Sequence, residues 1–480
     1  MRTTNLALAV LDRASRQPDK LAFVMAGRPI PYSRVAALVV NFARRMQGLR
    51  ISRQSIVGLA IRDMPTATIA TLAVALLGGR WVPVSSTSAS VYPGTTHVLA
   101  AGPAAKLPGR VAIDQSWYNA PPLPPGIPPF PGHADPDDAW MIAHSSGTTG
   151  KPKFMAISYG NVWRRIGNPE LQDGAAPTTW NLFPPTSAHG ARVNTGNLVL
   201  GGTNVAAAPW PELLRLGVNR VIGSPAQVSA AIFDRVEPPS RRIRSLKVAG
   251  AQVTQKFVAT ALTYFEELHL AYGATEVGAV TLWRLTATDQ FDGGAGRPGD
   301  GAEIEIVDEA SLPVTSGSEG IVRLRTPSIV PGYVNEPALT ADAFRGGWFH
   351  PGDRGFLDST GSLHITGRLN DVLNAGGMKL NASDLDEIIQ LHPSVADGYC
   401  FMLPDAQGVD VLSAMVSLRP GATPESLGTL RAMATASLGR SRAPHRAYVA
   451  ESMPRNESGK PMRAAAAQLA SRLEPIELPA

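Results

Sequence analysis

Residues His144–Lys153, with the sequence HSSGTTGKPK, combine side chains and backbone suited to binding an anion. Glycines let the backbone turn its N–H groups toward a ligand, hydroxyls add donors and lysines add positive charge, which together make a phosphate-binding loop. The apolar run AWMIAH before it is typical of a strand leading into such a loop. A solvated flexible loop is the alternative interpretation. The candidate phosphate ligands are Ser145, Ser146, Gly147, Thr148, Thr149, Gly150, Lys151 and Lys153.

The glycine spacing excludes a Walker A loop. That motif has four residues between its glycines and a Ser or Thr after its Lys. Here Gly147 and Gly150 enclose only two residues, and Pro152 follows Lys151. A P-loop kinase is therefore disfavoured.

A second candidate is the stretch YGATE, residues 272–276. The Tyr272 ring can stack on a base, and Thr275 can donate to a phosphate. Glu276 offers the hard oxygen ligand that Mg²⁺ prefers beside substrate phosphates. An ordinary turn is the competing interpretation.

Two more stretches carry suitable groups. Asp353, in a Pro-Gly-Asp turn, can accept hydrogen bonds from two ribose hydroxyls, and Arg368 supplies a planar set of donors. Lys460 lies in PRNESGKPMR near the end of the sequence. Taken singly, Asp353 and Arg368 could be paired surface charges, and Lys460 a solvated side chain.

Composition limits the classes of partner. A chain of 480 residues with 44% hydrophobic content is too long for one core, which predicts two or more domains. The net charge of +5 is modest, and the basic run 241–247 is more typical of a solvated edge than of a nucleic-acid surface. The single cysteine, Cys400, excludes an intrachain disulfide, fits a reducing compartment and lies in a strand-like run where burial is expected. No apolar stretch approaches transmembrane length, so a cytoplasmic protein is expected.

The elements that must position these residues alternate between helical and strand-like patterns. Apolar residues recur at helical spacing over 33–48, with Ser33 as the expected cap, and over 66–79; residues 55–61 and 80–84 are typical of buried strands. The same strand–turn–helix order is expected over 220–233, 245–265 and 268–280. Such alternation predicts a parallel sheet with helices on both faces.

The pattern changes in the second half of the chain. Short strands with Gly and Asp turns between residues 296 and 368 predict a β-rich subdomain, and a smaller α+β segment follows. A proline-rich connector, 119–136, leads into the phosphate loop and should be stiff. We therefore expect an α/β fold with a large N-terminal domain, 1–368, of parallel βα layers plus the β-rich subdomain. Residues 369–480 should form a small mobile α+β domain.

In this order, these stretches closely resemble the signatures of the adenylate-forming superfamily of acyl- and aryl-CoA synthetases, peptide-synthetase adenylation domains and luciferases. The matching segments are the phosphate loop, YGATE, HPGDRG with its later GR, GRLNDVLNAGGMKLNASDLDEI and PRNESGK. The resemblance covers nearly the whole chain. It implies that a carboxylic acid and ATP form an acyl-adenylate with release of pyrophosphate, and that a thiol then attacks this mixed anhydride.

The resemblance implies a role for each motif residue. The loop 145–153 would hold the β- and γ-phosphates, while Thr275 would contact the α-phosphate and Glu276 would hold Mg²⁺. Because the first step brings two anions together, positioning and positive charge should supply most of the catalysis. The residues implied for the nucleoside are Tyr272 and Gly273, with Gly250 and Ala251 at the adenine edge and Asp353 and Arg368 at the ribose.

The small domain would have two tasks. In one orientation it would present Lys460, which would bridge the carboxylate and the α-phosphate. Rotated about a hinge at Asn370, it would present Gly376 and Gly377, whose lack of side chains would let a pantetheine arm approach the backbone.

The chain departs from the family pattern at several positions. Phe154 replaces the Gly that usually follows the final Lys of the loop, and Asn370 replaces the usual Asp or Lys of the hinge. In the pocket segment FPPTSAHG, Ser187 stands at the usual His and His189 lies nearby. These departures should affect the choice of substrate and the reaction rate, but not the class of reaction. The pocket candidates, whose small members suggest room for a ring or a medium chain, are Ser187, His189, Val193, Ala249 and Ala274.

Coenzyme A is the expected thiol acceptor. The pocket segment lacks the Asp with which amino-acid-activating domains pair the substrate ammonium group, and AGGMKLNASDLDEI looks more like acyl- or aryl-CoA synthetases. A free-standing ligase that loads the pantetheine of a carrier protein is the main alternative. A degraded homologue that binds nucleotide without catalysis is a third interpretation.

Overall fold

The computed structural model describes most of the chain. The described residues are 4–25, 28–84, 92–123, 130, 132, 135–146, 152–167, 176–369, 372–375, 378–404, 410–455 and 461–479, without the side chains of 145, 146, 152, 372, 374, 375, 378 and 379.

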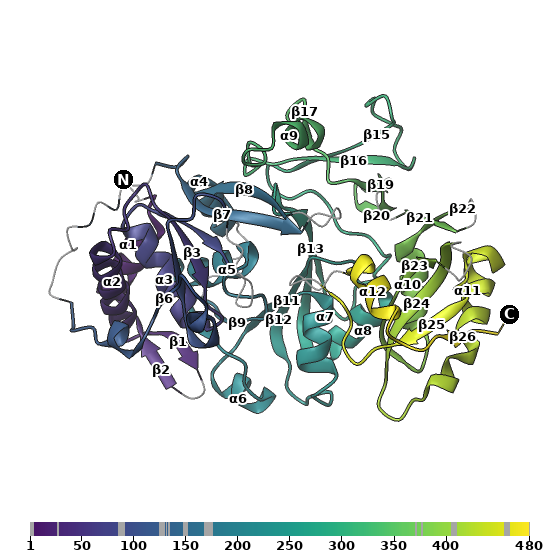
Figure 1. Ribbon diagram of the computed structural model, residues 1–480, viewed down its shortest axis with the longest axis horizontal. Helices are drawn as coiled ribbons and strands as arrows, with labels where there is room; N and C mark the ends of the chain where they lie inside the picture. Colours follow the sequence, from purple (N-terminus) through teal and green to yellow (C-terminus); the bar gives the residue numbers. More distant parts are fainter. Residues whose placement is uncertain are drawn as a thin grey trace.

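Two sheets build the larger body, and each has a parallel core (Figure 1). Within the described residues, the longer sheet has the order β14 (Gly278–Leu285), β13 (Phe265–Ala274), β12 (Ile243–Ala249), β11 (Arg220–Gly223), β9 (Thr178–Asn181), β10 (Thr203–Val205), β1 (Leu21–Met25), β2 (Arg28–Pro31). The second has the order β6 (Val111–Ala112), β5 (His97–Ala100), β3 (Ile56–Ala60), β4 (Arg80–Pro83), β7 (Ala139–Ser146), β8 (Pro152–Ser158). The longer sheet has an antiparallel strand at both edges, β14 and β2, and the second sheet has one at the β8 edge.

Helices pack between these sheets. α1 (Leu6–Arg16), α2 (Tyr32–Gly48), α3 (Met64–Leu76) and α5 (Ala188–Val199) share one hydrophobic cluster with buried side chains of β1, β3, β4 and β7. α3 is buried along almost its whole length because it consists of small and apolar residues, and Asp63 caps it. The prediction of Ser33 as a cap was wrong: α2 begins at Tyr32, directly after the extended Pro31.

The larger body contains further helices. α8 (Gln255–Tyr264) and α6 (Trp210–Arg215) pack in a second cluster with β11, β12 and β13. The remaining ones are η1 (Gly102–Lys106), η2 (Gln115–Tyr118), α4 (Tyr159–Ile166), α7 (Pro225–Val228) and η4 (Ser229–Phe233).

One expected helix is a strand. Residues after the 272–276 stretch form β14, antiparallel to β13, instead of returning through a helix. Gly278 has φ +81°, which permits the tight turn. The sequence GAVTLWRL is rich in β-branched and aromatic side chains, which favour a strand.

The predicted β-rich subdomain is confirmed. It is an antiparallel sheet of β15 (Glu303–Val307), β16 (Gly320–Arg325), β17 (Phe344–Arg345), β18 (Trp348–Phe349), β19 (Asp353–Leu357) and β20 (Leu363–Arg368), with α9 (Pro337–Ala343).

The last part of the chain forms a separate α+β body, at the right in Figure 1, with hydrophobic clusters of its own. Cys400 is buried in its strand β23, as predicted. Its elements are β21 (Val372–Ala375), β22 (Met378–Asn381), α10 (Ala382–Leu391), β23 (Val395–Pro404), β24 (Asp410–Leu418), η5 (Pro424–Thr429), α11 (Leu430–Leu438), η6 (Arg440–Arg442), β25 (Arg446–Val449), α12 (Arg463–Ala470) and β26 (Ile476–Glu477).

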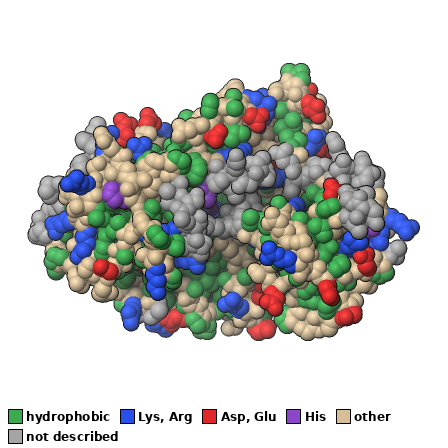
Figure 2. All heavy atoms as spheres, viewed as in Figure 1, with side chains coloured by type: hydrophobic (Ala, Val, Ile, Leu, Met, Phe, Trp, Pro, Cys, Tyr) green, Lys and Arg blue, Asp and Glu red, His purple; other side chains and the backbone are tan. Residues whose placement is uncertain are grey.

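Two further features are the distribution of charged side chains on the surface and the length and polarity of the helices. On the face in Figure 2, Lys and Arg side chains lie scattered among Asp and Glu side chains. None of the helices in the described part of the chain has both the length and the apolar character that crossing a membrane requires.

Candidate active site

The two glycine-containing motifs of the large body each connect a pair of antiparallel strands. The phosphate loop joins β7 to β8, where Ser145 pairs with Lys153, and the 272–276 stretch leads from β13 into β14. Ser145 and Ser146 are the last residues of β7, and the strand expected before the loop is confirmed. The loop positions Gly147, Thr148, Thr149, Gly150 and Lys151 lie outside the described residues.

Glu276 is a buried carboxylate with one well-defined partner. Its side chain is only 5% exposed, and its Oε1 accepts a hydrogen bond of 3.0 Å from the Tyr333 hydroxyl. Burial, and then the Glu276 charge, raise the pKa of Tyr333, so its hydroxyl stays a donor. The ammonium group of Lys153 lies 5.2 Å from the centre of the Tyr333 ring. Tyr333 therefore links the base of the phosphate loop to Glu276.

Residues 326–334, here called the connecting segment, fix this region. Val330 N–H donates to the Glu276 carbonyl at 2.8 Å, and Val334 N–H donates to the Phe154 carbonyl on β8 at 2.8 Å. The Ser328 carbonyl accepts from Asn161 at 2.6 Å. One segment thus joins β8, α4 and the 272–276 turn.

Arg165 lies directly behind the 272–276 turn. One guanidinium nitrogen donates to the Thr275 carbonyl at 3.2 Å and to the Ser328 carbonyl at 2.9 Å. Burial, with a smaller contribution from Arg192, lowers the pKa of Arg165 to about 9, and Glu276 opposes that fall. Arg165 therefore places a positive charge beside Thr275 and Glu276.

Three residues predicted to contact the nucleoside come together across two sheets. The Tyr272 hydroxyl donates to Asp353 Oδ2 at 2.7 Å, and Arg368 Nε lies 3.1 Å from Asp353 Oδ1. Asp353 opposes Arg368 in the β19–β20 pair and is only 3% exposed. Burial and the adjacent Asp353 raise the pKa of Tyr272. A buried carboxylate held this way presents an acceptor to hydroxyl groups of a ligand.

The other predicted nucleoside residues lie at strand ends. Gly250 and Ala251 are exposed in the turn after β12, and Gly250 has φ +94°. Gly273 lies near the end of β13, where an added Cβ would meet the Gly278 carbonyl at 2.0 Å. Ala249 and Ala274 end β12 and β13.

The pocket candidates at the start of α5 make different local contacts. Ser187 caps the helix: its hydroxyl accepts from Gly190 N–H at 3.0 Å and donates to the Pro184 carbonyl at 2.8 Å. The His189 ring packs against Phe183, with centroids 4.4 Å apart. Val193 is buried in a cluster with Phe183 and Ile222. His189 and Val193 thus lie beside an apolar surface, while the Ser187 hydroxyl is engaged by the backbone.

The small body anchors both ends of the segment that carries Lys460. Lys460 itself, like Asn370, Gly376 and Gly377, lies outside the described residues. Met462 N–H donates to the Pro454 carbonyl at 3.0 Å, which brings the two ends of the segment together.

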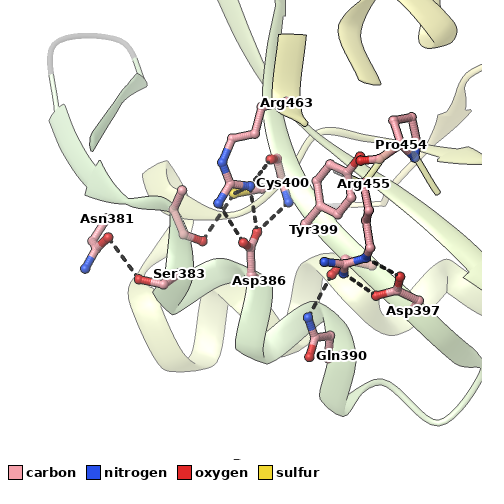
Figure 3. Close-up of polar contacts among 12 residues, drawn as sticks. Asn381, Ser383, Asp386, Gln390, Asp397, Tyr399, Cys400, Pro454, Arg455 and Arg463 are labelled. Carbon is pink, nitrogen blue, oxygen red and sulfur yellow. Dashed lines mark hydrogen bonds and ion pairs between the residues drawn. The ribbon is translucent and has the colours of Figure 1, made fainter. Parts of the chain in front are cut away.

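Two arginines hold those ends (Figure 3). Arg455 pairs with Asp397 at 2.5 Å and Arg463 pairs with Asp386 at 2.7 Å. The guanidinium carbons of Arg455 and Arg463 lie 5.3 and 5.8 Å from the centre of the Tyr399 ring. The frame of this segment is therefore fixed by two ion pairs around one aromatic ring.

Sequence reasoning missed Arg165, Arg192 and Tyr333. For Arg165 and Tyr333 the signals in the sequence were the arginine pair in NVWRRIG and the tyrosine in PGY, and Arg192 follows His189 in AHGARVN. Neither pattern identifies a site before the fold brings α4 and the connecting segment to the 272–276 turn.

The fold matches that of solved synthetase structures. A structure of o-succinylbenzoate CoA synthetase from Bacillus subtilis in complex with its acyl-adenylate intermediate aligns with a TM-score of 0.80 at 19% identity, over 95% of this chain and 97% of that chain. An amide bond synthetase from Marinactinospora thermotolerans aligns with a TM-score of 0.77 at 22% identity, over 97% and 99% of the two chains. At these identities the likeness shows the fold alone.

The chain belongs to the AMP-binding enzyme family. The family model matches residues 10–90 and 89–334, and the model of the AMP-binding enzyme C-terminal domain matches residues 384–460. The resemblance to adenylate-forming synthetases of the acyl- and aryl-CoA type is thereby confirmed.

Curated relatives are similar at lower coverage. A probable CoA ligase of Humulus lupulus is 26% identical over 353 residues, which is 68% of this chain and 66% of that protein. Oxalate–CoA ligase of Arabidopsis thaliana is 27% identical over 360 residues, 69% and 68% of the two chains. The alignments span about two thirds of the length of these relatives.

Proposed function

We propose that this chain is an AMP-forming acid–CoA ligase. A carboxylate oxygen of the acid attacks the α-phosphorus of ATP and pyrophosphate leaves; the thiol of coenzyme A then attacks the acyl carbon and AMP leaves. The family membership and the names of the curated relatives, which are CoA ligases, support this proposal. The single observation that carries it is the buried Glu276 held by Tyr333, whose ring faces Lys153 at the base of the phosphate loop.

The residues around Glu276 suit the magnesium ion that accompanies ATP. Mg²⁺ takes hard oxygen ligands, commonly one carboxylate with substrate phosphates. Tyr333 occupies Oε1 of Glu276, while Oε2 makes no hydrogen bond within the described residues. Bound there, the ion would polarise phosphate oxygens as a Lewis acid. Glu276 would hold the metal, and Tyr333 and Arg165 would fix the carboxylate and the turn that carries it.

The nucleotide roles that the family resemblance implies belong to the same proposal. Lys153 and the loop 145–151 would bind the β- and γ-phosphates, and Thr275 would contact the α-phosphate. Tyr272 would pack on adenine, with Gly250, Ala251 and Gly273 around it. Asp353 and Arg368 would bind the ribose hydroxyls.

The small body would complete the site in two orientations. We assign the boundary between the domains to residues 368 and 369, with the hinge at Asn370. Lys460 would contact the reacting carboxylate and the α-phosphate in the first step. Gly376 and Gly377 would line the path of the pantetheine in the second. A cytoplasmic location belongs to the same proposal and is supported by the single, buried cysteine.

The direct test is a panel of carboxylic acids assayed for pyrophosphate release, with and without coenzyme A. We expect at least one acid to release pyrophosphate with ATP and Mg²⁺, and to yield acyl-CoA and AMP when coenzyme A is added. Pyrophosphate release with thioester formed only on an added carrier protein would identify the acceptor as that carrier. Tight ATP binding without pyrophosphate release for any acid would contradict the proposed ligase activity.

A further inference from the structure

Arg192 lies beside the pocket candidates, and none of the carboxylates in the described part of the chain pairs with it. It lies on α5, one turn after His189, and its guanidinium NH2 group is 3.5 Å from the Nε2 atom of His189. Within the described residues it makes no ion pair. By contrast, the exposed Arg215 and Arg284 each pair with a glutamate of their own. Apart from the contact with His189, the guanidinium donors of Arg192 have no partner among the described residues.

Among the described residues, the charged groups that act on the neighbouring His189 are all cations. The cations acting on His189 are Arg192, Lys247 of β12 and Arg165, and burial together with these charges holds the pKa of His189 well below its usual value, so the ring stays neutral. Burial alone lowers the pKa of Arg192 to about 10, which still leaves it charged at neutral pH. The carboxylate of this region, Glu276, acts on Arg165 and belongs to the proposed metal site.

A desolvated guanidinium next to other cations is unfavourable unless an anion joins it. The reacting carboxylate and the phosphates of ATP already have partners in the proposed mechanism, at Lys460, Thr275 and the phosphate loop. Arg192 instead contacts His189, whose ring packs on Phe183 beside Val193. This side of the site is the place for the far end of the acid, with the apolar surface alongside its carbon skeleton.

We propose that the acid this chain activates carries a second carboxylate, and that Arg192 binds that distal group. The substrate class is therefore a dicarboxylic acid, in which one carboxylate reacts with ATP and the other pairs with the guanidinium group. The inference rests on the proposed acid–CoA ligase function and names its substrate class.

Matched acids and variants test this inference. Glutarate, adipate and phthalate would each be compared with its monomethyl ester, which keeps the carbon skeleton but has one charge fewer and one added methyl group. The rates of acid-dependent exchange of labelled pyrophosphate into ATP give kcat/KM, and thermal shift in the presence of a non-hydrolysable ATP analogue reports acid binding. The variants are Arg192→Met, Arg192→Lys and, as the control, Arg164→Met, which removes an equal charge from an exposed position on α4.

We expect at least one dicarboxylate to exceed its monoester by about 10- to 100-fold in kcat/KM, mainly through KM, as a charge-assisted pair would give. Arg192→Met should remove most of this preference, Arg192→Lys should keep part of it, and Arg164→Met should leave it unchanged. Thermal stabilisation by the ATP analogue alone should be the same in all variants.

Equal use of each diacid and its monoester by the wild type, or a loss of activity in Arg192→Met that is the same for both, would overturn the inference while the ligase function stands. Binding of no acid would overturn it as well. Arg192-dependent binding of a dicarboxylate without any pyrophosphate exchange would keep the inference and contradict the ligase function.

Discussion

At the scale of single residues, Glu276 is the central group of the proposed site. Its carboxylate is buried, and the only donor to that carboxylate within the described residues is the Tyr333 hydroxyl. Glu276→Gln keeps the shape and removes the charge. We expect adenylation to slow by about 100- to 1,000-fold, the range seen when a preorganised electrostatic group is lost, and the Mg²⁺ concentration needed for half-maximal rate to rise. Pyrophosphate exchange measured across a magnesium titration checks both effects.

Tyr333→Phe is the matched control for that experiment. It keeps the ring that faces Lys153 but removes the hydroxyl donor, so a loss of about tenfold or less is expected. An unchanged magnesium dependence in Glu276→Gln would contradict the metal role and leave the metal to ATP alone.

A second prediction at the residue scale concerns His350 and the pH dependence of the free energy of unfolding. Both ring nitrogens are buried without hydrogen-bond partners within the described residues, and burial followed by Arg345 and Arg323 lowers the pKa of His350 to about 4. As pH falls below 6.5 the unfolded chain takes up a proton that the folded chain refuses. The neutral ring therefore favours the folded state above pH 6.5, and this contribution is lost between pH 6.5 and 4.

The expected loss at His350 is about 1–2 kcal/mol after allowance for solvent screening. Urea unfolding of wild type and His350→Gln at a series of pH values would measure it. The difference between the two free energies of unfolding should change over this pH window and be flat below it. A constant difference across the window would show that the ring titrates normally.

At the scale of elements, α10, β23 and α12 meet through the pair of Arg463 and Asp386. Both side chains are largely buried, at 15% and 12% exposure, and Asp386 also accepts from Cys400 N–H at 2.7 Å. Arg463→Ala would leave a buried carboxylate without its cation. We expect a loss of about 3–5 kcal/mol in the free energy of unfolding of the small body, measured by urea denaturation of the intact chain.

The same body offers the control. Arg446 and Glu477 pair at 2.6 Å between β25 and β26, but at 30% and 68% exposure. Arg446→Ala should cost less than about 1 kcal/mol because water screens this pair. Equal costs for the two substitutions would mean that burial does not govern the Arg463 pair.

The elements also show how far a sequence predicts structure. Strands β3, β4 and β7 and helix α3 were predicted because apolar runs ended at polar or glycine residues. β14 was not, since a turn after a parallel strand was expected to lead into a helix. The choice depended on Gly278 and on pairing with β13, a tertiary contact that periodicity does not report.

The prediction of site residues was also limited by contacts that form only on folding. Motif residues such as Tyr272 and Asp353 could be named from the resemblance, although 81 positions separate them. Arg165 and Arg192 belong to no motif. Their importance comes from what surrounds them after folding, and the burial that sets their pKa values is a property of the assembled chain.

At the scale of the whole molecule, the two bodies divide the proposed reaction between them. Lys460→Ala should reduce formation of acyl-adenylate from acid and ATP to near background, because the charge that bridges the two anions is gone. Thioester formation from a supplied acyl-adenylate should stay largely intact. Separate assays of the two half-reactions check this, and wild-type adenylation by the variant would show that another group supplies the charge.

The connecting segment also has a consequence for how the protein is made. Asn161 and its partner Ser328 are 167 positions apart, so at ~5–20 residues per second a ribosome needs roughly ten to thirty seconds between them. During that interval β8, an edge strand of its sheet, lacks the Val334 contact, and the turn at Glu276 lacks its support. The proposed ATP site is therefore incomplete until the connecting segment has been made, so ATP binding should follow the folding of this region rather than precede it.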